Sequence, residues 1–178
     1  GARAGTVTLG GGTLNIGSDG MYQEINGTIN LNSGTLGALA GWSSTMAMTL
    51  GGSVDIDTTG GDIALSGALT GTGGFAKEGS GTLTLSGDSS NYTGDTTIYA
   101  SGGTLQVGGA GQLESGSYGG AISIGSASTF AYSSSADLTL SGYSTGDGAL
   151  IKGSSGTLTL SGANTYAGDT TIDAGSLK

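Results

Sequence analysis

The sequence of 178 residues lacks cysteine and proline altogether, and it contains no run of about 20 apolar residues. The absence of cysteine excludes a disulfide framework and thiol chemistry. The absence of a long apolar run excludes a helix that spans a bilayer. The chain starts at Gly1 rather than at a methionine and shows no signal peptide, so we expect it to be a piece of a longer protein.

Basic residues are also scarce. The chain has 4 of them against 13 acidic residues, which gives a formal net charge of −9. Binding to phosphate backbones or to anionic lipid needs clustered lysine and arginine, whereas the basic residues here stand singly, at Arg3, Lys77, Lys152 and Lys178. We therefore expect no nucleic-acid partner and no docking to anionic membranes, and we interpret the acidity as a contribution to solubility.

Glycine, by contrast, is abundant, with 40 residues. Such a composition can accompany disorder, but disordered segments combine high charge with low hydrophobicity, and here 10% of the residues are charged and 35% are hydrophobic. Apolar residues alternate with polar ones over short runs, as in Val54/Ile56 and Leu138/Leu140. This alternation predicts strands with one buried face, and the Gly-Gly, Ser-Gly and Asn-Gly pairs between the runs predict turns.

The sequence also repeats itself at a fixed distance. Residues 81–87 read GTLTLSG and return unchanged as residues 156–162, an offset of 156 − 81 = 75. Residues 62–67 resemble 137–142 at the same offset, and residues 91–98 resemble 164–172. A long fixed period predicts a repeat architecture, in which each unit buries its apolar face against its neighbours.

Short strands joined by turns also occur in sandwiches and barrels, but the self-similarity and the small aliphatic core positions favour a β-solenoid. We predict a single all-β solenoid over residues 1–178, with internal repeats at 62–107 and 137–178. Coils of about 20–25 residues give about eight coils, each rising about 4.8 Å, the spacing of neighbouring strands. The offset of 75 residues then corresponds to about three coils.

The ends of the predicted solenoid carry no recognisable cap. A solenoid needs polar caps over its terminal coils, because an open strand edge recruits further strands. Residues 173–178 stop where the first copy continues through residues 103–107. We therefore expect the chain to belong to a longer solenoid, or to be a subunit that stacks end to end into a filament.

The two copies extend well beyond the shared heptapeptide. The first reads FAKEGSGTLTLSG over residues 75–87, NYTGDTTI over 91–98 and GTL over 103–105. The second reads LIKGSSGTLTLSG over 150–162, NTYAGDTTI over 164–172 and GSL over 175–177. Both resemble the autotransporter-associated β-strand repeat, also called the passenger-associated transport repeat. The motif residues, for which we expect structural roles, are Lys77, Gly81, Leu83, Leu85, Gly87, Asn91, Tyr92, Gly94, Ile98, Lys152, Gly156, Leu158, Leu160, Gly162, Asn164, Tyr166, Gly168 and Ile172.

The resemblance implies a right-handed parallel β-helix, exported and displayed outside a bacterium or at its outer-membrane surface. It further implies that such repeats form the stalks of large adhesin-like passengers, and it brings no catalytic residue and no cofactor. Two departures from the pattern stand out: the first copy has an extra residue near Ser90, and the second has Ser154–Ser155 where Gly-Ser is expected.

Carboxylates and the single tryptophan are the remaining candidates for chemistry. Asp55 and Asp57 share the outer side of one predicted strand, with Asp62 nearby, and polysaccharide hydrolysis uses paired carboxylates. We interpret them as solvated side chains that flank buried Ile56, and Trp42 as a packing residue. Calcium prefers oxygen donors, but one carboxylate per turn makes a poor site, so we expect no cofactor; the donors considered are Asp19, Glu24, Asp55, Asp57, Asp62, Asp95 and Asp169.

Two functions of different classes remain. The first is a non-catalytic structural module of a bacterial surface protein, which acts as a stalk, spacer or fibre subunit and has its own repeats as partners. The second is a carbohydrate-binding or carbohydrate-active β-helix that contacts cell-surface glycans or host surfaces. The second requires Trp42, Asp55, Asp57 and Asp62 to converge in one cleft, whereas the first predicts that they scatter.

Overall fold

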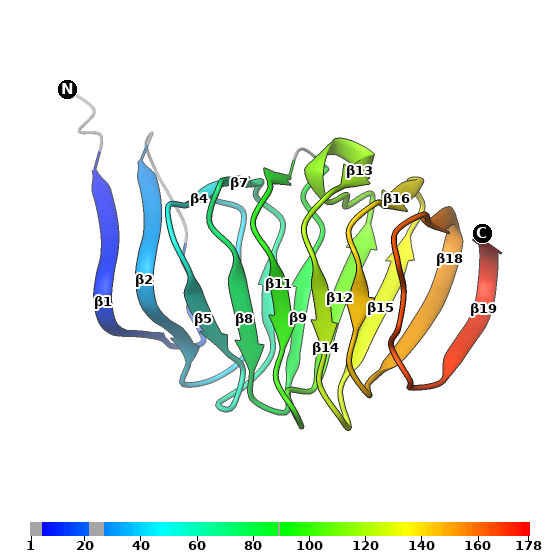
Figure 1. Ribbon diagram of the computed structural model, residues 1–178. Coiled ribbons are helices and arrows are strands. Elements are labelled where there is room, and N and C mark those ends of the chain that lie inside the picture. Colours follow the sequence, from blue (N-terminus) through cyan, green and yellow to red (C-terminus); the bar gives the residue numbers. More distant parts are fainter. Residues whose placement is uncertain (1–4, 22–26, 89) are drawn as a thin grey trace.

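The computed structural model describes residues 5–21, 27–88 and 90–178, which form 19 strands and one short 3-10 helix. The chain winds as a β-solenoid from β1 at one end to β19 at the other (Figure 1). The elements are β1 (Thr6–Ile16), β2 (Thr28–Ala38), β3 (Trp42–Ser44), β4 (Met48–Leu50), β5 (Val54–Asp57), β6 (Ile63–Leu65), β7 (Leu69–Gly71), β8 (Phe75–Glu78), β9 (Thr82–Leu85), β10 (Asn91–Tyr92), β11 (Thr96–Ile98), β12 (Thr104–Gly109), η1 (Glu114–Gly116), β13 (Ser117–Tyr118), β14 (Ile122–Ile124), β15 (Thr129–Ser134), β16 (Leu138–Leu140), β17 (Ser144–Thr145), β18 (Ala149–Leu160) and β19 (Thr170–Leu177).

The strands form three faces around one core, and the strand pairs between coils are parallel. Face 1 contains β4, β7, β10, β13 and β16, face 2 contains β5, β8, β11, β14 and β17, and face 3 contains β3, β6, β9, β12 and β15 (Figure 1). The long strands bend around corners: β2 pairs with β4 on face 1 and β5 on face 2, and β18 pairs with β15 on face 3 and β16 on face 1. The prediction of an all-β solenoid of about eight coils is confirmed.

Coil length varies while the ladder stays in register. Partners are 48 − 29 = 19 residues apart at Ile29↔Met48 and 124 − 98 = 26 apart at Ile98↔Ile124. The longest coil holds the extra residues in η1, where Ser115 has a left-handed φ of 52°. Leu113 immediately before η1 is fully buried, so the bulge is anchored by an apolar side chain while its backbone turns outside the ladder.

The core is a set of side-chain columns that run along the solenoid. On face 2, Ile56, Ile98 and Ile124 belong to one column, since each occupies an inward position of successive paired strands. Every second residue of a strand points inward, so the alternation in the sequence becomes a continuous apolar stack. The innermost side chains include Leu31, Leu36, Leu50, Leu65, Phe75, Leu83, Leu105, Val107, Phe130, Leu138 and Leu158.

The sequence repeat and the coil are not commensurate. Three coils after Leu83 the register reaches Leu150, by way of Leu105 and Phe130. The sequence counterpart of Leu83 is Leu158, which lies eight residues further along (158 − 150) and pairs with Leu138 on face 1. The offset of 75 residues is therefore three coils plus one face, rather than about three coils as the composition of the turns predicts.

Both ends of the solenoid are open in the described residues. There, β1 pairs only with β2, and β19 pairs only with β18. Inward-side residues of these end strands are solvent-exposed, with Val7 at 44% and Ile172 at 53%. Among the described residues, no helix has the length and hydropathy that crossing a membrane demands.

Candidate functional site

The two motif lysines lie inside the solenoid, where the sequence predicts aliphatic side chains. Lys77 stands between Ile56 and Ile98 in the inward column of face 2, and Lys152 follows Tyr132 in an inward column of face 3. Both lysine side chains are completely buried. The signal in the sequence was the alternation Phe75-x-Lys77 and Leu150-x-Lys152, which places each lysine on the same side as the apolar residue two positions before it.

The Lys77 ammonium joins three successive coils through neutral oxygens. Its Nζ donates to Thr58 Oγ1 of the preceding coil at 2.8 Å, to Gly79 O of its own coil at 2.9 Å, and to Gly102 O of the following coil. Thr58 is itself buried, and its hydroxyl lies 3.0 Å from Glu78 O. A buried charge is tolerated only where its donors are satisfied, and the corner between faces 2 and 3 supplies these acceptors from its turn carbonyls.

Lys152 repeats this arrangement at the corner between faces 3 and 1. Its Nζ donates to Ser154 O in its own coil and to Ala174 O of the next coil, the latter at 3.3 Å. Ser154 is the counterpart of Gly79 at the same offset of 75 (154 − 79). The Nζ also lies 5.5 Å from the centre of the Tyr132 ring, a cation–π distance. Each copy thus uses lysine to hold the turn that follows it.

Burial changes the protonation of these lysines in a direction that can be measured. Desolvation lowers the pKa of Lys77 to about 8, although the nearby carboxylates of Asp57 and Asp62 act the other way. Desolvation also lowers the pKa of Lys152. For the buried tyrosines, desolvation raises the pKa of Tyr92 well above its usual value and that of Tyr118 to about 12.

We expect the stability of the protein to rise from pH 8 to pH 10 and to fall above pH 10. Between these values unfolded lysine stays protonated, with a pKa of about 10.4, while folded Lys77 releases its proton, so the unfolded state holds more protons and raising the pH favours the fold. Above pH 10 the unfolded tyrosines ionise while Tyr118 keeps its proton, which reverses the slope. Urea unfolding at pH 7, 8, 9, 10 and 11 measures this profile; a steady decline from pH 8 to 10 contradicts it.

Tyrosine and threonine hydroxyls form a buried chain between faces 1 and 2. The Tyr118 hydroxyl donates to Gly94 O at 2.6 Å, a carbonyl that can only accept. It therefore accepts from Thr96 Oγ1 at 2.8 Å, and Thr96 Oγ1 in turn accepts from the Tyr92 hydroxyl at 2.9 Å. The rings of Phe75, Tyr92 and Tyr118 stack in tilted contacts with centres 5.6 and 5.4 Å apart. The second copy keeps the local bond, since the Tyr166 hydroxyl lies 2.8 Å from Thr170 Oγ1.

Aspartate carboxylates connect each coil to the backbone of the next. Asp62 Oδ1 accepts from Thr82 N at 2.7 Å, and Asp137 Oδ1 accepts from Thr157 N at the same distance, a pair of bonds related by the 75-residue offset. Asp95 Oδ1 likewise accepts from Ala121 N at 2.8 Å. These bonds give the acidic residues a structural task beyond the solubility that composition predicts.

The predicted motif residues divide by their distance from the open end. Buried members are Lys77, Leu83, Leu85, Gly87, Tyr92, Ile98, Lys152, Gly156 and Leu158, whereas Gly81, Gly94, Leu160, Gly162, Asn164, Tyr166 and Gly168 are half-buried. Asn91 is exposed at a corner, and Ile172 is exposed because it lies in the last described coil. Asn164 Nδ2 donates to Gly162 O at 2.8 Å, which fixes the turn between them.

The four residues that a carbohydrate-active cleft requires do not converge. Trp42 is 4% exposed and faces the interior next to Ile63. Asp55 and Asp57 lie on the outer side of face 2, and Asp62 holds Thr82 N at the next corner. The carboxylates considered for calcium do not gather either: within the described residues no group of three or more could hold a metal ion. Glu24 and Arg3 lie outside the described residues.

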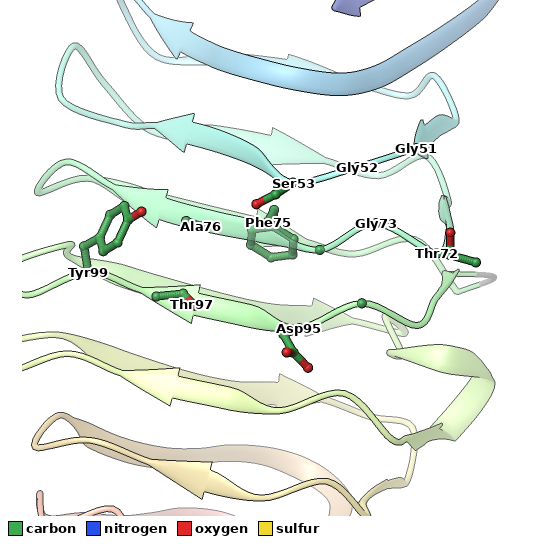
Figure 2. A pocket seen from close by; sticks show the side chains of 12 residues that line it. Gly51, Gly52, Ser53, Thr72, Gly73, Phe75, Ala76, Asp95, Thr97 and Tyr99 are labelled. Atoms are coloured by element: carbon green, nitrogen blue, oxygen red, sulfur yellow. The ribbon is translucent and has the colours of Figure 1, made fainter. Parts of the chain in front are cut away.

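A shallow trough of about 560 Å³ crosses the outer side of face 2. It is lined by glycines at the turns before β5, β8 and β11 and by side chains of β8 and β11. Figure 2 shows Asp95, Thr97 and Tyr99 spaced along the β11 segment, with Ala76 on the neighbouring strand. The trough is hollow because Gly74 and Ala76 are small where outward side chains would otherwise fill it.

Comparison with known proteins matches two segments of the chain. Residues 75–107 and 150–178 match the family model described as Passenger-associated-transport-repeat. Over 120 residues the chain is 38% identical to a protein named "Adhesin BmaC autotransporter" from Brucella suis biovar 1 (strain 1330). The match covers 62% of this chain and 4% of that relative, so the chain spans a small part of the length of the curated protein it matches. No solved structure matches significantly.

Proposed function

Because this chain carries two passenger-associated transport repeats, we propose that it is a stiff, non-catalytic segment of an exported bacterial surface protein, and that it acts there as a stalk or spacer. The relative is named an adhesin and an autotransporter, which supports a place in the passenger part, outside the cell or at the outer-membrane surface. The observation that carries the proposal is the continuous parallel ladder along all three faces.

Stiffness follows from how the coils are joined. Backbone hydrogen bonds connect every coil to the next, and inward side chains fill the space between them. Lys77 and the aspartates add bonds that cross from one coil to another at the corners, where the ladder is interrupted. A rod held both in its faces and at its corners resists bending, which is what a spacer requires.

The C-terminal end is prepared for a further coil of the same kind. In the first copy the next coil covers each key residue: Ile124 lies over Ile98, and Phe130 lies over Leu105. The counterparts in the second copy, Ile172 and Leu177, have no such cover in the described residues. We propose that the partner of this end is another coil of the repeat, either further along the same chain or in a second copy.

Extension of the chain tests this directly. A copy of residues 107–142 fused after Lys178 places the same residues after Leu177 that follow Leu105 and Gln106 in the first copy. We expect the fused segment to fold as additional coils, to slow amide exchange in residues 170–177 by at least tenfold, and to lengthen the particle by about 4.8 Å per coil. Hydrogen exchange and small-angle X-ray scattering measure these two results.

The matched control is the same fusion with aspartate at the copied positions of both Ile124 and Phe130. This variant has the same length and similar turns, but it cannot cover Ile172 and Leu177. It should leave exchange in residues 170–177 unchanged. If the unsubstituted fusion stays unstructured, or if the particle grows in width instead of length, the chain is not a segment of an extendable rod.

A further inference from the structure

Tyr99 is a large aromatic side chain that the fold leaves in solvent. It is 47% exposed, and it lines the trough on face 2 (Figure 2). Its neighbours in the trough, Ala76 and Thr97, are small, so one flat side of the ring stands free above a shallow floor. A half-exposed aromatic at a hollow offers apolar contact area at little cost in side-chain entropy.

Polar groups in the same trough are available for a ligand. The hydroxyls of Ser53, Thr72 and Thr97 line it and form no hydrogen bond within the described part of the chain. The Asp95 carboxylate stands at the other end of the β11 segment, where Ala121 N holds its Oδ1 at 2.8 Å. This bond orients the carboxylate before any ligand arrives, so the second oxygen can accept hydrogen bonds without further ordering.

The spacing and the charge of the trough restrict what fits. Asp95 and Tyr99 are four residues apart on one extended segment, about 13 Å at about 3.3 Å per residue. Asp55 and Glu78 add negative charge nearby, and the partial burial of Glu78 beside Asp57 and Asp55 raises its pKa. Anionic ligands are repelled by this surface, whereas an elongated, uncharged molecule rich in hydroxyl groups meets both an aromatic ring and hydrogen-bond acceptors.

We propose that this trough binds a short, uncharged oligosaccharide, with one sugar ring stacked on Tyr99 and hydroxyl groups bonded to Asp95 and Thr97. Binding at this trough is separate from the role of the rod, since no core residue or corner bond takes part. It also differs from the cleft around Trp42, Asp55, Asp57 and Asp62 that the sequence suggested, because Trp42 lies in the interior.

Titration with lactose, maltotriose, cellotriose and chitotriose, followed by amide chemical shifts, tests the site. We expect at least one of these neutral sugars to shift the amides of Gly73, Gly74, Ala76 and Gly94. Sialyllactose, the anionic counterpart of lactose, should bind at least tenfold more weakly than the best neutral sugar. Absence of shifts with every neutral sugar at 10 mM, or equal binding of sialyllactose, overturns the proposal.

Three variants locate the binding. Tyr99→Ala should weaken the best sugar at least tenfold, and Asp95→Asn should weaken it about threefold or more while its amide oxygen still accepts from Ala121 N. Tyr143→Ala is the matched control, because Tyr143 is 55% exposed but does not line the trough. Thermal unfolding confirms that each variant is folded. Equal loss of binding in Tyr99→Ala and Tyr143→Ala would mean that the sugar binds elsewhere, and the proposal fails.

Discussion

Replacement of Gly94 by alanine is expected to lower the free energy of unfolding by about 3–5 kcal/mol, the range of severe core substitutions. A Cβ at this position would overlap the carbonyl carbon of Gly73 and the nitrogen of Gly74, with Gly73 O at 2.5 Å. These atoms are backbone of the coil below, and they cannot rotate away as a side chain would. The coils cannot separate either, because Thr93 N donates to Gly71 O at 3.0 Å in the same corner.

Gly108→Ala provides the matched control for this substitution. Gly108 lies in the central strand β12, and the nearest atom to its new Cβ is Gln106 Nε2 at 3.3 Å, at the end of a flexible side chain. We expect a change within about 1 kcal/mol. Urea unfolding monitored by circular dichroism compares the two variants. Similar destabilisation by both would show that glycine acts here through chain entropy and not through the close approach of stacked corners.

Replacement of Lys77 by alanine is expected to destabilise the fold by about 2–4 kcal/mol. The substitution removes three methylene groups from the core, worth about 0.8 kcal/mol each, and leaves a cavity between Ile56 and Ile98. It also leaves Gly102 O, buried at the corner, without the donor that bonds it, which costs about 1–3 kcal/mol. Release of the buried charge offsets part of this loss.

Lys77→Met separates the stem of the lysine from its charge. Methionine fills most of the same volume but neither carries a proton nor donates a hydrogen bond. The relief of desolvation and the orphaned Gly102 carbonyl then nearly cancel, so we expect a change within about 1 kcal/mol at pH 7. The rise in stability between pH 8 and pH 10 should shrink to the part that Lys152 contributes.

The same pair of variants tests whether Lys77 couples coils that do not touch. In a simple solenoid each coil contacts only its neighbours, whereas the Lys77 ammonium bonds the coil of Thr58 and the coil of Gly102 at once. Hydrogen exchange should show the amides of Gly61 and Ser101 opening together in the wild type and separately in Lys77→Met. If they open separately in both proteins, or together in both, lysine does not carry the coupling.

Lysine burial is where inference from the sequence alone stopped short. The alternation of Phe75 with Lys77 assigned the lysine an inward position, but four single basic residues in a polar, glycine-rich chain suggested a solvent-exposed charge. Carbonyl groups from three coils make the burial tolerable. Those groups come from residues 19 to 25 positions away, so no local pattern could bring them together.

Aspartate was misjudged in a similar way for part of its members. Asp62 and Asp137 were interpreted as solvated, and they are exposed, but each holds a backbone N–H of the next coil. The bond partners are 20 residues ahead, one coil along. Trp42 was correctly assigned to packing, because a large aromatic gains most from burial.

The sequence by itself determined that this chain is an all-β solenoid. Alternation of apolar residues fixes which side of each strand is buried, glycine pairs mark the corners, and a repeated motif requires units that stack. Only the tertiary structure decided on which face each copy of the motif lies, since coil lengths from 19 to 26 residues add up to three coils and one face between copies. That sum depends on how many residues each corner absorbs outside the ladder, and it is settled by packing against the neighbouring coils.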